Sequence, residues 1–206
     1  MPKKHSRNVP SGRSAAARLL LEVIDDHRSL NTTRALAFTD LAPPERRLAS
    51  ELVYGVLRWL QQLESILGEL LEKPLRQRDR DVHMLLLTGI YQTVHLSVPD
   101  HVAVSQTVEA ARHLGKDWAA GLVNGVLRRL QRNRQVLVSR ATQNDEARFA
   151  FPRWLLEQLK SAWPQQWQQV AEASNQRAPM SLRVNSLRQS RGAFLQLLSD
   201  QGIPAK

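Results

Sequence analysis

One seven-residue phrase occurs twice in this chain, and each copy has the residue spacing of a single helix face. The phrase Leu-Val-x-Gly-Val-Leu-Arg occupies residues 52–58 and again residues 122–128. On a helix its leucine and valine side chains project to one side, and the glycine leaves room for a neighbouring helix. Because glycine in a helix costs about 1 kcal/mol relative to alanine, we expect a packing reason at both Gly55 and Gly125. The repeat therefore predicts two similar helix crossings, one in each half of an all-helical domain.

Apolar residues recur at helical spacing along most of the chain, which has little of the alternation typical of strands. The prolines at 43 and 44, with Asp40 as cap and Glu45 in the first turn, indicate the start of a long helix. Ser97 and Asp100 have the spacing of a capping box. The helices that we predict cover 15–27, 31–38, 43–71 with a break near Arg58 or Gly68, 82–94, 102–114, 118–138 and two shorter segments within 152–176.

The pattern changes near the end of the sequence. The segment "MSLRVNSL", residues 180–187, alternates apolar and polar side chains, as a strand does, and a capped helix that ends at Gly202 follows it. A lone strand lacks partners for its backbone donors and acceptors. We therefore expect an incomplete α/β subdomain here, and we interpret the sequence as the N-terminal portion of a longer protein.

Positive charge gathers in two stretches of a chain whose formal net charge is +10. Clustered Lys and Arg neutralise phosphates and release counterions, so we expect a nucleic acid as the partner, with a merely solvated surface as the alternative. The candidate RNA-binding residues are Lys3, Lys4, Arg7, Arg13 and Arg18 in the first stretch, and Arg112, Lys116, Arg128, Arg129, Arg132 and Arg134 in the second. A third group, Arg76, Arg78 and Arg80, alternates with Asp79 and Asp81, and we interpret it as local ion pairing in a linker.

Several kinds of site are excluded or disfavoured. The chain has no cysteine, so it offers no thiolate nucleophile, disulfide or cysteine metal ligand. Its six histidines lack the spacing of a helical zinc site, and no Gly-x-Gly pair exists to hold a nucleotide. No apolar run is long enough for a secretory signal or a membrane span, so we expect a soluble, cytoplasmic protein without metal, membrane or catalytic residues of its own.

Five phrases of this sequence resemble, in order, the N-terminal part of the Sun/Fmu family of bacterial small-subunit ribosomal RNA methyltransferases. They are "ELVYGVLRWL", "LLLTGIYQTVHLSVPDHVAVSQTVEAAR", "GLVNGVLRRLQR", "PRWLLEQLKSAWP" and "MSLRVNSL". Residues 1–14 are rich in cations and poor in apolar side chains, so we expect them to form a basic mobile arm. The resemblance implies a NusB-like RNA-binding helical bundle of two packed halves over 15–140 and a linking region over 141–206. That last region would start a small α/β subdomain that leads into the catalytic domain.

The resemblance also implies a chemistry that this chain cannot perform alone. The family transfers a methyl group from S-adenosylmethionine to cytosine C5 in small-subunit ribosomal RNA, and it uses cysteine thiolates and a glycine-rich loop that are absent here. We therefore expect an RNA-binding part whose partners are small-subunit ribosomal RNA and the catalytic domain of its own parent chain. The alternatives are a free-standing NusB-type antitermination factor and an adaptor that binds acidic protein.

Overall fold

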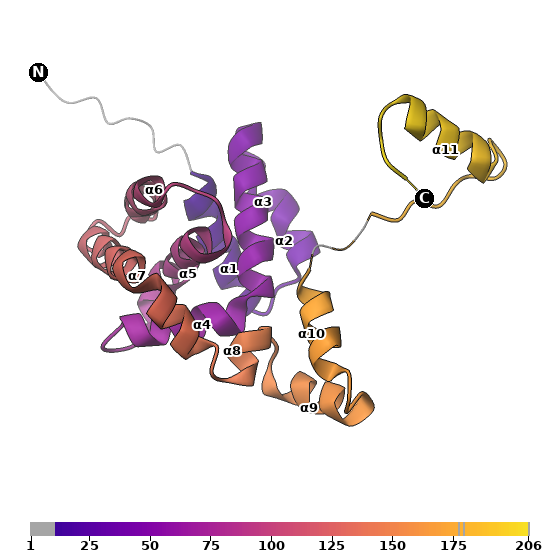
Figure 1. Cartoon of the computed structure of the whole chain (residues 1–206). Coiled ribbons are helices and arrows are strands. Elements are labelled where there is room, and N and C mark those ends of the chain that lie inside the picture. Colours follow the sequence, from indigo (N-terminus) through magenta and orange to yellow (C-terminus); the bar gives the residue numbers. More distant parts are fainter. Residues whose placement is uncertain (1–10, 177, 179, 206) are drawn as a thin grey trace, which may run out of the picture. The chain divides into compact units, whose positions relative to one another are not determined.

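The computed structural model describes residues 11–176, 178 and 180–205, and the ordered elements in this part of the chain are all helices (Figure 1). The all-α class expected from the sequence is therefore confirmed. The chain divides into two compact units, Met1–Asn175 and Gln176–Lys206. None of the helices within the described ranges is long and apolar enough to cross a membrane.

The first unit contains a bundle of two halves and a short helical extension. The helices of the first half are α1 (Gly12–Ile24), α2 (Leu30–Ala37) and α3 (Pro43–Arg58). Those of the second half are α4 (Leu60–Leu70), α5 (Arg80–His95), α6 (Asp100–His113) and α7 (Ala119–Ala141), with the short 3-10 helix η1 (Gln77–Asp79) before α5. One copy of the repeated phrase lies in α3 and the other in α7, so each half carries one, as the repeat predicts.

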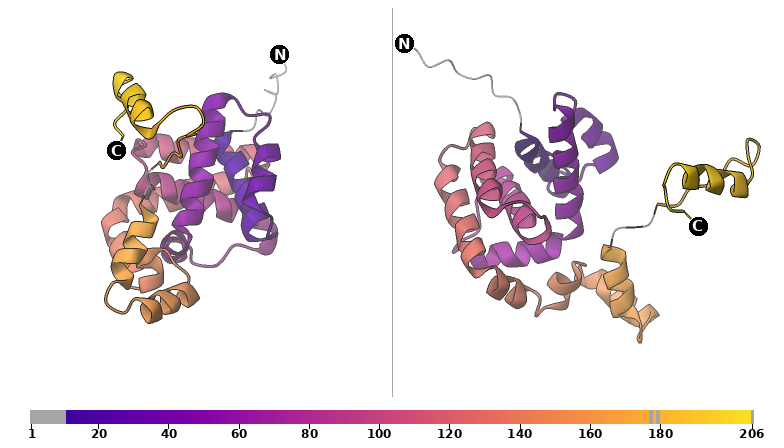
Figure 2. Two further views of the ribbon diagram at one scale, coloured as in Figure 1. Left: turned by 90° about the vertical axis from the view of Figure 1, so that its right-hand side faces the viewer. Right: turned by 45° about the horizontal axis from the view of Figure 1, so that its top comes forward.

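Helix α5 forms the centre of the bundle. It lies between α1 and α3 on one side and α6 and α7 on the other (Figures 1 and 2). Residues 84–93 are all buried, and a helix that is enclosed on every side belongs to a core. The polar side chains in this stretch find local partners: the hydroxyls of Thr88 and Thr93 donate to the carbonyls of Leu85 and Gly89 at 2.8 and 3.0 Å.

The helix ends differ from the expected boundaries in ways that local hydrogen bonds explain. Helix α1 begins at Gly12, not Ala15, because the Ser11 hydroxyl accepts from the Ser14 N–H at 3.2 Å. Glu45 also extends α1, since its carboxylate accepts from the Gly12 N–H at 2.5 Å. The last residues of the predicted arm 1–14 are therefore helical, and residues 1–10 lie outside the described part.

Two predicted N-terminal caps do not form. Helix α3 follows Ala42 as its N-cap residue, so Asp40 is not the cap, although the prolines do occupy the first turn. Helix α6 follows Pro99 and begins at Asp100 without a side-chain cap, so the capping box at Ser97 is wrong as well. Proline fixes the backbone angle φ and has no N–H group that needs an acceptor. A proline at the start of each helix therefore explains why neither helix uses the side-chain cap that the spacing suggested.

The two glycines of the repeated phrase have opposite environments. A Cβ added to Gly55 would lie 2.0 Å from Cζ of Tyr91, so α3 does approach α5 closely there. A Cβ added to Gly125 would meet no atom within 4 Å, and the expected packing reason at this position is wrong. The close approach between α5 and α7 occurs instead at Gly89, where an added Cβ would lie 2.8 Å from a methyl group of Leu127.

Three further helices complete the first unit: α8 (Asp145–Phe149), α9 (Arg153–Ala162) and α10 (Trp167–Asn175). The last two were expected, whereas α8 lies in a stretch for which no helix was predicted. Asn144 caps α8 by accepting from the Glu146 N–H at 2.7 Å. Phe149 makes a small separate core with Leu156 and Ala171, so the extension has apolar packing of its own.

The second unit contains helix α11 (Arg191–Asp200) and no strand within its described residues. The prediction of a strand over 180–187 is therefore wrong for this chain. Leu182 is exposed, and the segment bends at Asn185, whose side chain accepts from the Leu187 N–H at 3.0 Å. A strand needs a neighbour to pair with, and the unit supplies none. The predicted helix is confirmed, with Ser190 as its cap and Gly202 just beyond its end at φ 71°.

Candidate nucleic-acid interface

Near its middle, α7 presents two arginines that have no acidic partner within the described residues. Arg128 and Arg132 lie four residues apart, so they share one face of the helix, and both are exposed. Nε of Arg128 donates to Oδ1 of Asn124 at 3.3 Å, while Arg132 makes no hydrogen bond or ion pair within the described residues. Because no carboxylate neutralises them, both guanidinium groups are free to bind phosphate oxygens.

The neighbouring face of α7 is open along its length. Trp118, at the N-terminal end of α7, has a side chain that is 55% exposed. Gly125 and Arg129 follow at steps of seven and four residues, which places them on the same side of the helix. Nothing lies within 4 Å of a Cβ built at Gly121 or Gly125. A partner could therefore approach the helix backbone closely here.

Two adjoining hollows flank this open face. The smaller, of 380 Å³, is lined by the end of α4 and by α7, including Leu122 and Arg129. The larger, of 650 Å³, lies between the segment after α4 and the start of α7, and it includes Trp118 and Lys116. Lys73 and Leu75 line both hollows, so the two adjoin, and we refer to the pair as the depression.

The segment between α4 and α5 adds cations that the sequence interpretation missed. Lys73, Arg76 and Arg78 are exposed and line the depression. Arg78 does pair with Asp79 at 3.6 Å, as expected, but Arg80 pairs with the distant Asp25 at 2.8 Å and leaves the group. The high density of cations over residues 73–80 is the sequence feature that could have indicated a nucleic-acid interface here. Sequence spacing alone favours local ion pairing instead, because it does not show that the fold brings α7 beside this segment.

These residues make up one surface, which we call the cationic face. Five of its residues line the hollows: Lys73, Arg76, Arg78, Trp118 and Arg129, whose Nη1 also donates to the carbonyl of Leu70 at 3.4 Å. Arg128 and Arg132, on the adjoining exposed side of α7, complete it. Its acidic residues are few: Glu72 and Asp79 line the hollows. Cations around an exposed aromatic ring are the combination by which proteins hold single-stranded nucleic acid, with phosphates on the cations and a base on the ring.

Lys116 stabilises the cationic face through contacts with protein groups, so its charge is already paired. Its Nζ donates to Oδ1 of Asp79 at 3.0 Å and to the carbonyl of Arg78 at 2.9 Å, and it lies 3.4 Å from Oδ1 of Asp81. The hydrogen bond to Asp79 raises the pKa of Lys116, and the same bond lowers the pKa of Asp79. Lys116 therefore fixes the segment before α5 against the start of α7.

Three other predicted cations are engaged with protein groups. Arg112 pairs with Glu109 on its own helix. Arg134 pairs with Asp100 at the start of α6, and its Nε is buried without a partner. Arg18 is exposed and donates to the carbonyl of His113 at 3.2 Å. These contacts leave each of them less available to an RNA phosphate than Arg128 or Arg132.

Arg13 is not part of a basic arm. It lies in α1 with only 7% of its surface exposed, and its Nε donates to Oε1 of Gln92 on α5 at 2.8 Å. Burial lowers the pKa of Arg13 below the usual value for a guanidinium. The prediction that Arg13 binds RNA from a mobile arm is therefore wrong, because its side chain belongs to the α1–α5 contact. Lys3, Lys4 and Arg7 lie outside the described residues.

The histidines and carboxylates do not assemble a metal or acid–base site in the part of the chain that the structure describes. No three potential ligands gather there. His83 binds the carboxylate of Glu64 through Nε2 at 2.8 Å. His95 stacks on Trp59, and burial lowers its pKa to about 4. Both rings thus serve packing between helices.

Comparison with known proteins finds two families along the chain, the first of which agrees with the helical bundle. A model of the NusB family matches residues 10–132, and a model of a ferredoxin-like domain, described as Methyltr_RsmF/B-like, matches residues 151–206. Among curated proteins, the chain is 42% identical over 191 residues to the ribosomal RNA small subunit methyltransferase B of Vibrio vulnificus. It is 43% identical over 191 residues to that of Vibrio cholerae and 41% identical over 193 residues to that of Erwinia tasmaniensis.

These matches cover nearly all of this chain but only part of each relative. They cover 93–94% of this chain but only 44–45% of each of the three relatives. The chain therefore spans less than half the length of the curated relatives that it matches. The resemblance drawn from the five sequence phrases is confirmed over that length.

Proposed function

From the premise that this chain belongs to the NusB family, we propose that it is the RNA-binding N-terminal part of a small-subunit ribosomal RNA cytosine-C5 methyltransferase. In this role the helical bundle holds the RNA. The methyl transfer is carried out by a catalytic domain, which corresponds to the part of the relatives' sequences that this chain does not cover. The protein acts in the cytoplasm, and its partners are small-subunit ribosomal RNA and its own catalytic domain.

The observation that carries the proposal is the order of the two matched families in one chain. A NusB match over 10–132 is followed by the RsmF/B-like ferredoxin-like match over 151–206. A free-standing antitermination factor needs only the helical bundle, so the second match favours a part of a methyltransferase. We propose domain limits of 15–140 for the bundle and 141–206 for the linking region.

The cationic face supplies the physical means of holding RNA. Its arginines on α7 lack carboxylate partners among the described residues, so phosphates can replace water and counterions around them without breaking an existing ion pair. Trp118, at the N-terminal end of α7, supplies a stacking surface. Such contacts fix the position of an RNA strand and carry little information about its sequence.

The methyl donor and the reacting base belong to the catalytic domain in this proposal. S-adenosylmethionine supplies the methyl group for cytosine C5, and the Sun/Fmu methyltransferases that the sequence resembles use cysteine thiolates for that step. The present chain has no cysteine. It should therefore transfer no methyl group by itself, and detectable transfer by the purified chain would contradict the proposed division of labour.

The test is the salt dependence of RNA binding by a triple variant. Arg128→Gln/Arg129→Gln/Arg132→Gln removes three phosphate contacts, each of which contributes about 0.7 to the slope of log affinity against log salt concentration on single strands. The slope should become shallower by about 2, and the affinity at 0.1 M salt should fall by about a hundred-fold. A fluorescence-anisotropy titration with a small-subunit ribosomal RNA fragment measures both quantities.

A matched control separates the face from net charge. Arg28→Gln/Arg153→Gln/Arg188→Gln also removes three exposed charges, from positions outside the cationic face. Equal weakening by the two triple variants would mean that only net charge matters. Binding of polyglutamate, with no binding of RNA, would instead favour an adaptor for acidic protein.

A further inference from the structure

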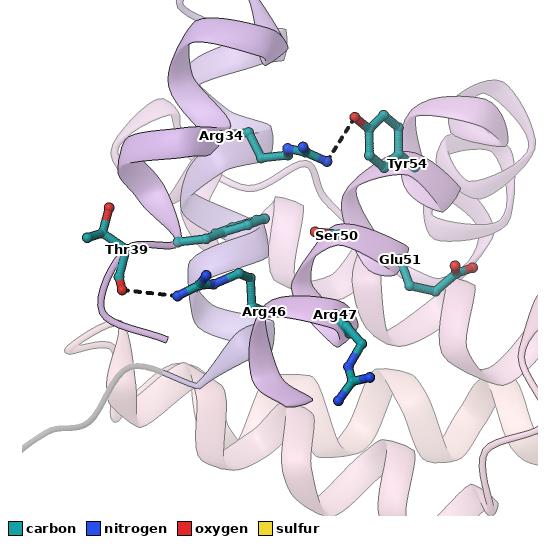
Figure 3. Close-up of a pocket in the computed structure, with 8 residues that line it drawn as sticks. Arg34, Thr39, Arg46, Arg47, Ser50, Glu51 and Tyr54 are labelled. Carbon is teal, nitrogen blue, oxygen red and sulfur yellow. Dashed lines mark hydrogen bonds between the residues drawn. The ribbon is translucent and has the colours of Figure 1, made fainter. Parts of the chain in front are cut away.

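A second hollow with unpaired arginines lies on the opposite half of the bundle. Helices α2 and α3 and the turn between them line an open hollow of 620 Å³ (Figure 3). Its lining residues are Arg34, Phe38, Thr39, Arg46, Arg47, Ser50, Glu51 and Tyr54. Three arginines from two helices thus line one hollow, and a single carboxylate accompanies them. The side chain of Arg47 extends away from those of Arg34 and Arg46 (Figure 3).

The arginines of this hollow lack acidic partners within the described residues, whereas several other cations of the bundle have one. Arg80, Arg112, Lys116 and Arg134 are each paired with an aspartate or glutamate. No such pair involves Arg34, Arg46 or Arg47 within the described residues. The one nearby carboxylate, Glu51, accepts a hydrogen bond from the Tyr91 hydroxyl at 2.9 Å and extends away from the arginines (Figure 3). The hollow therefore has a net positive charge.

Two of the guanidinium groups are already held in place by neutral groups. Arg34 donates through Nη1 to the Tyr54 hydroxyl at 3.2 Å, and its guanidinium carbon lies 5.6 Å from the centre of that ring. Arg46 donates through Nη2 to the carbonyls of Thr39 and Leu41 at 3.3 and 3.2 Å. Each guanidinium group keeps further N–H groups that can bind a ligand. Because its orientation is already fixed, it loses less conformational entropy when the ligand binds.

Hydroxyl and aromatic groups complete the set of contacts that a nucleotide needs. Ser50 lies within the lining, and its hydroxyl makes no hydrogen bond within the described residues. Tyr54 is 43% exposed, so part of its ring faces solvent beside the arginines. Guanidinium forks with hydroxyls suit phosphate oxygens, and an exposed ring suits a sugar or base. An acidic peptide would use the arginines but would have no need of the ring.

We propose that this α2–α3 hollow is a second RNA site, which binds a phosphodiester between Arg34 and Arg46, with Arg47 at its rim and Tyr54 against the adjacent nucleoside. It is distinct from the cationic face, because α5 packs between α3 and α7. A bound strand would have to pass around the bundle from one site to the other. The inference rests on the proposed function, since it assumes that RNA is the ligand of the chain.

The test uses the whole chain and a labelled poly-uridine strand that is long enough to reach both sites. The variant is Arg34→Gln/Arg47→Gln, because neither residue bonds to the backbone, whereas Arg46 holds two carbonyls of the turn. Loss of two phosphate contacts should make the log–log salt slope shallower by about 1.4 and weaken binding about 25-fold at 0.1 M salt. Tyr54→Leu should weaken binding with no change in slope, because it removes stacking and no charge.

The control is Arg153→Gln/Arg188→Gln, which removes the same charge from outside the first seven helices. Binding that is unchanged in the α2–α3 variant but weakened in the triple variant of the cationic face would overturn this inference and leave the proposed function intact. Absence of RNA binding by the unmodified chain would overturn the proposed function itself. If polyglutamate binding falls in the α2–α3 variant while RNA binding does not, the hollow serves an acidic protein and the inference fails.

Discussion

Replacement of Gly55 by alanine should distinguish the two copies of the repeated phrase by the sign of its effect on stability. The added Cβ would lie 2.0 Å from Cζ and 2.3 Å from the hydroxyl of Tyr91. That ring cannot swing aside without loss, because Tyr91 is 6% exposed, donates to Glu51 at 2.9 Å, and stacks on His95 with ring centres 5.5 Å apart. The helices α3 and α5 would have to separate.

The magnitude follows from two opposing terms. Overpacking of a filled core costs about 1–3 kcal/mol, and an overlap this deep should reach the upper end of that range. Alanine regains about 1 kcal/mol of helix propensity over glycine. The net loss at Gly55 should therefore be about 2 kcal/mol. At Gly125, where a Cβ meets nothing within 4 Å, only the propensity term acts. Gly125→Ala should therefore stabilise the fold by about 0.5–1 kcal/mol.

Urea unfolding followed by circular dichroism measures both free energies. A second comparison isolates the contact: in a Tyr91→Leu background the ring is gone, and Gly55→Ala should then cost little or become favourable. If Gly55→Ala and Gly125→Ala shift stability in the same direction, or if the cost at Gly55 persists without the Tyr91 ring, the reasoning about close approach is refuted.

Three other perturbations test single contacts. Burial lowers the pKa of His95 to about 4, so its contribution to stability is present above pH 6.5 and lost as the pH falls toward 4. The free energy of unfolding should drop by about 2 kcal/mol more between pH 7 and pH 5 than in His95→Gln, and parallel pH profiles would rule this out. Lys116→Gln should speed amide hydrogen exchange over residues 72–79 while exchange in α5 stays slow; equal rates in variant and parent would deny Lys116 its supporting role. Arg13→Met leaves Oε1 of Gln92 without its donor, which should cost about 1–3 kcal/mol of stability and little RNA affinity. A loss of affinity as large as that caused by Arg132→Gln would restore Arg13 to the interface.

Periodicity was enough to find the helices because their apolar faces are decided locally. Helix α2 begins within one residue of its expected start, and the break near Arg58 falls where α3 ends. What spacing cannot give is the identity of the neighbour. Gly55 and Gly125 occur in the same phrase, yet one faces Tyr91 and the other faces solvent. The strand at 180–187 fails for a related reason, since strands depend on pairing partners supplied from elsewhere.

The candidate interface shows the same division between local and distant information. The roles of Arg128 and Arg132 could be predicted from the sequence, because these side chains have no ion-pair partner within the described residues that only folding would reveal. Lys116 was assigned to RNA, but its carboxylate partners lie 35 and 37 residues earlier and are brought to it only by folding. Lys73 and Arg76 were missed because their value arises from a depression shared with α7.

The central claim is that RNA lies along the cationic face. Ultraviolet cross-linking of the chain to a small-subunit ribosomal RNA fragment, followed by mass spectrometry of the joined peptides, tests it most directly. Cross-links should fall at Trp118 and within the segments 72–79 and 119–132, and they should disappear when salt is raised enough to release the strand. Cross-links confined to residues 151–205, with none on α7 or the segment before α5, would contradict the account.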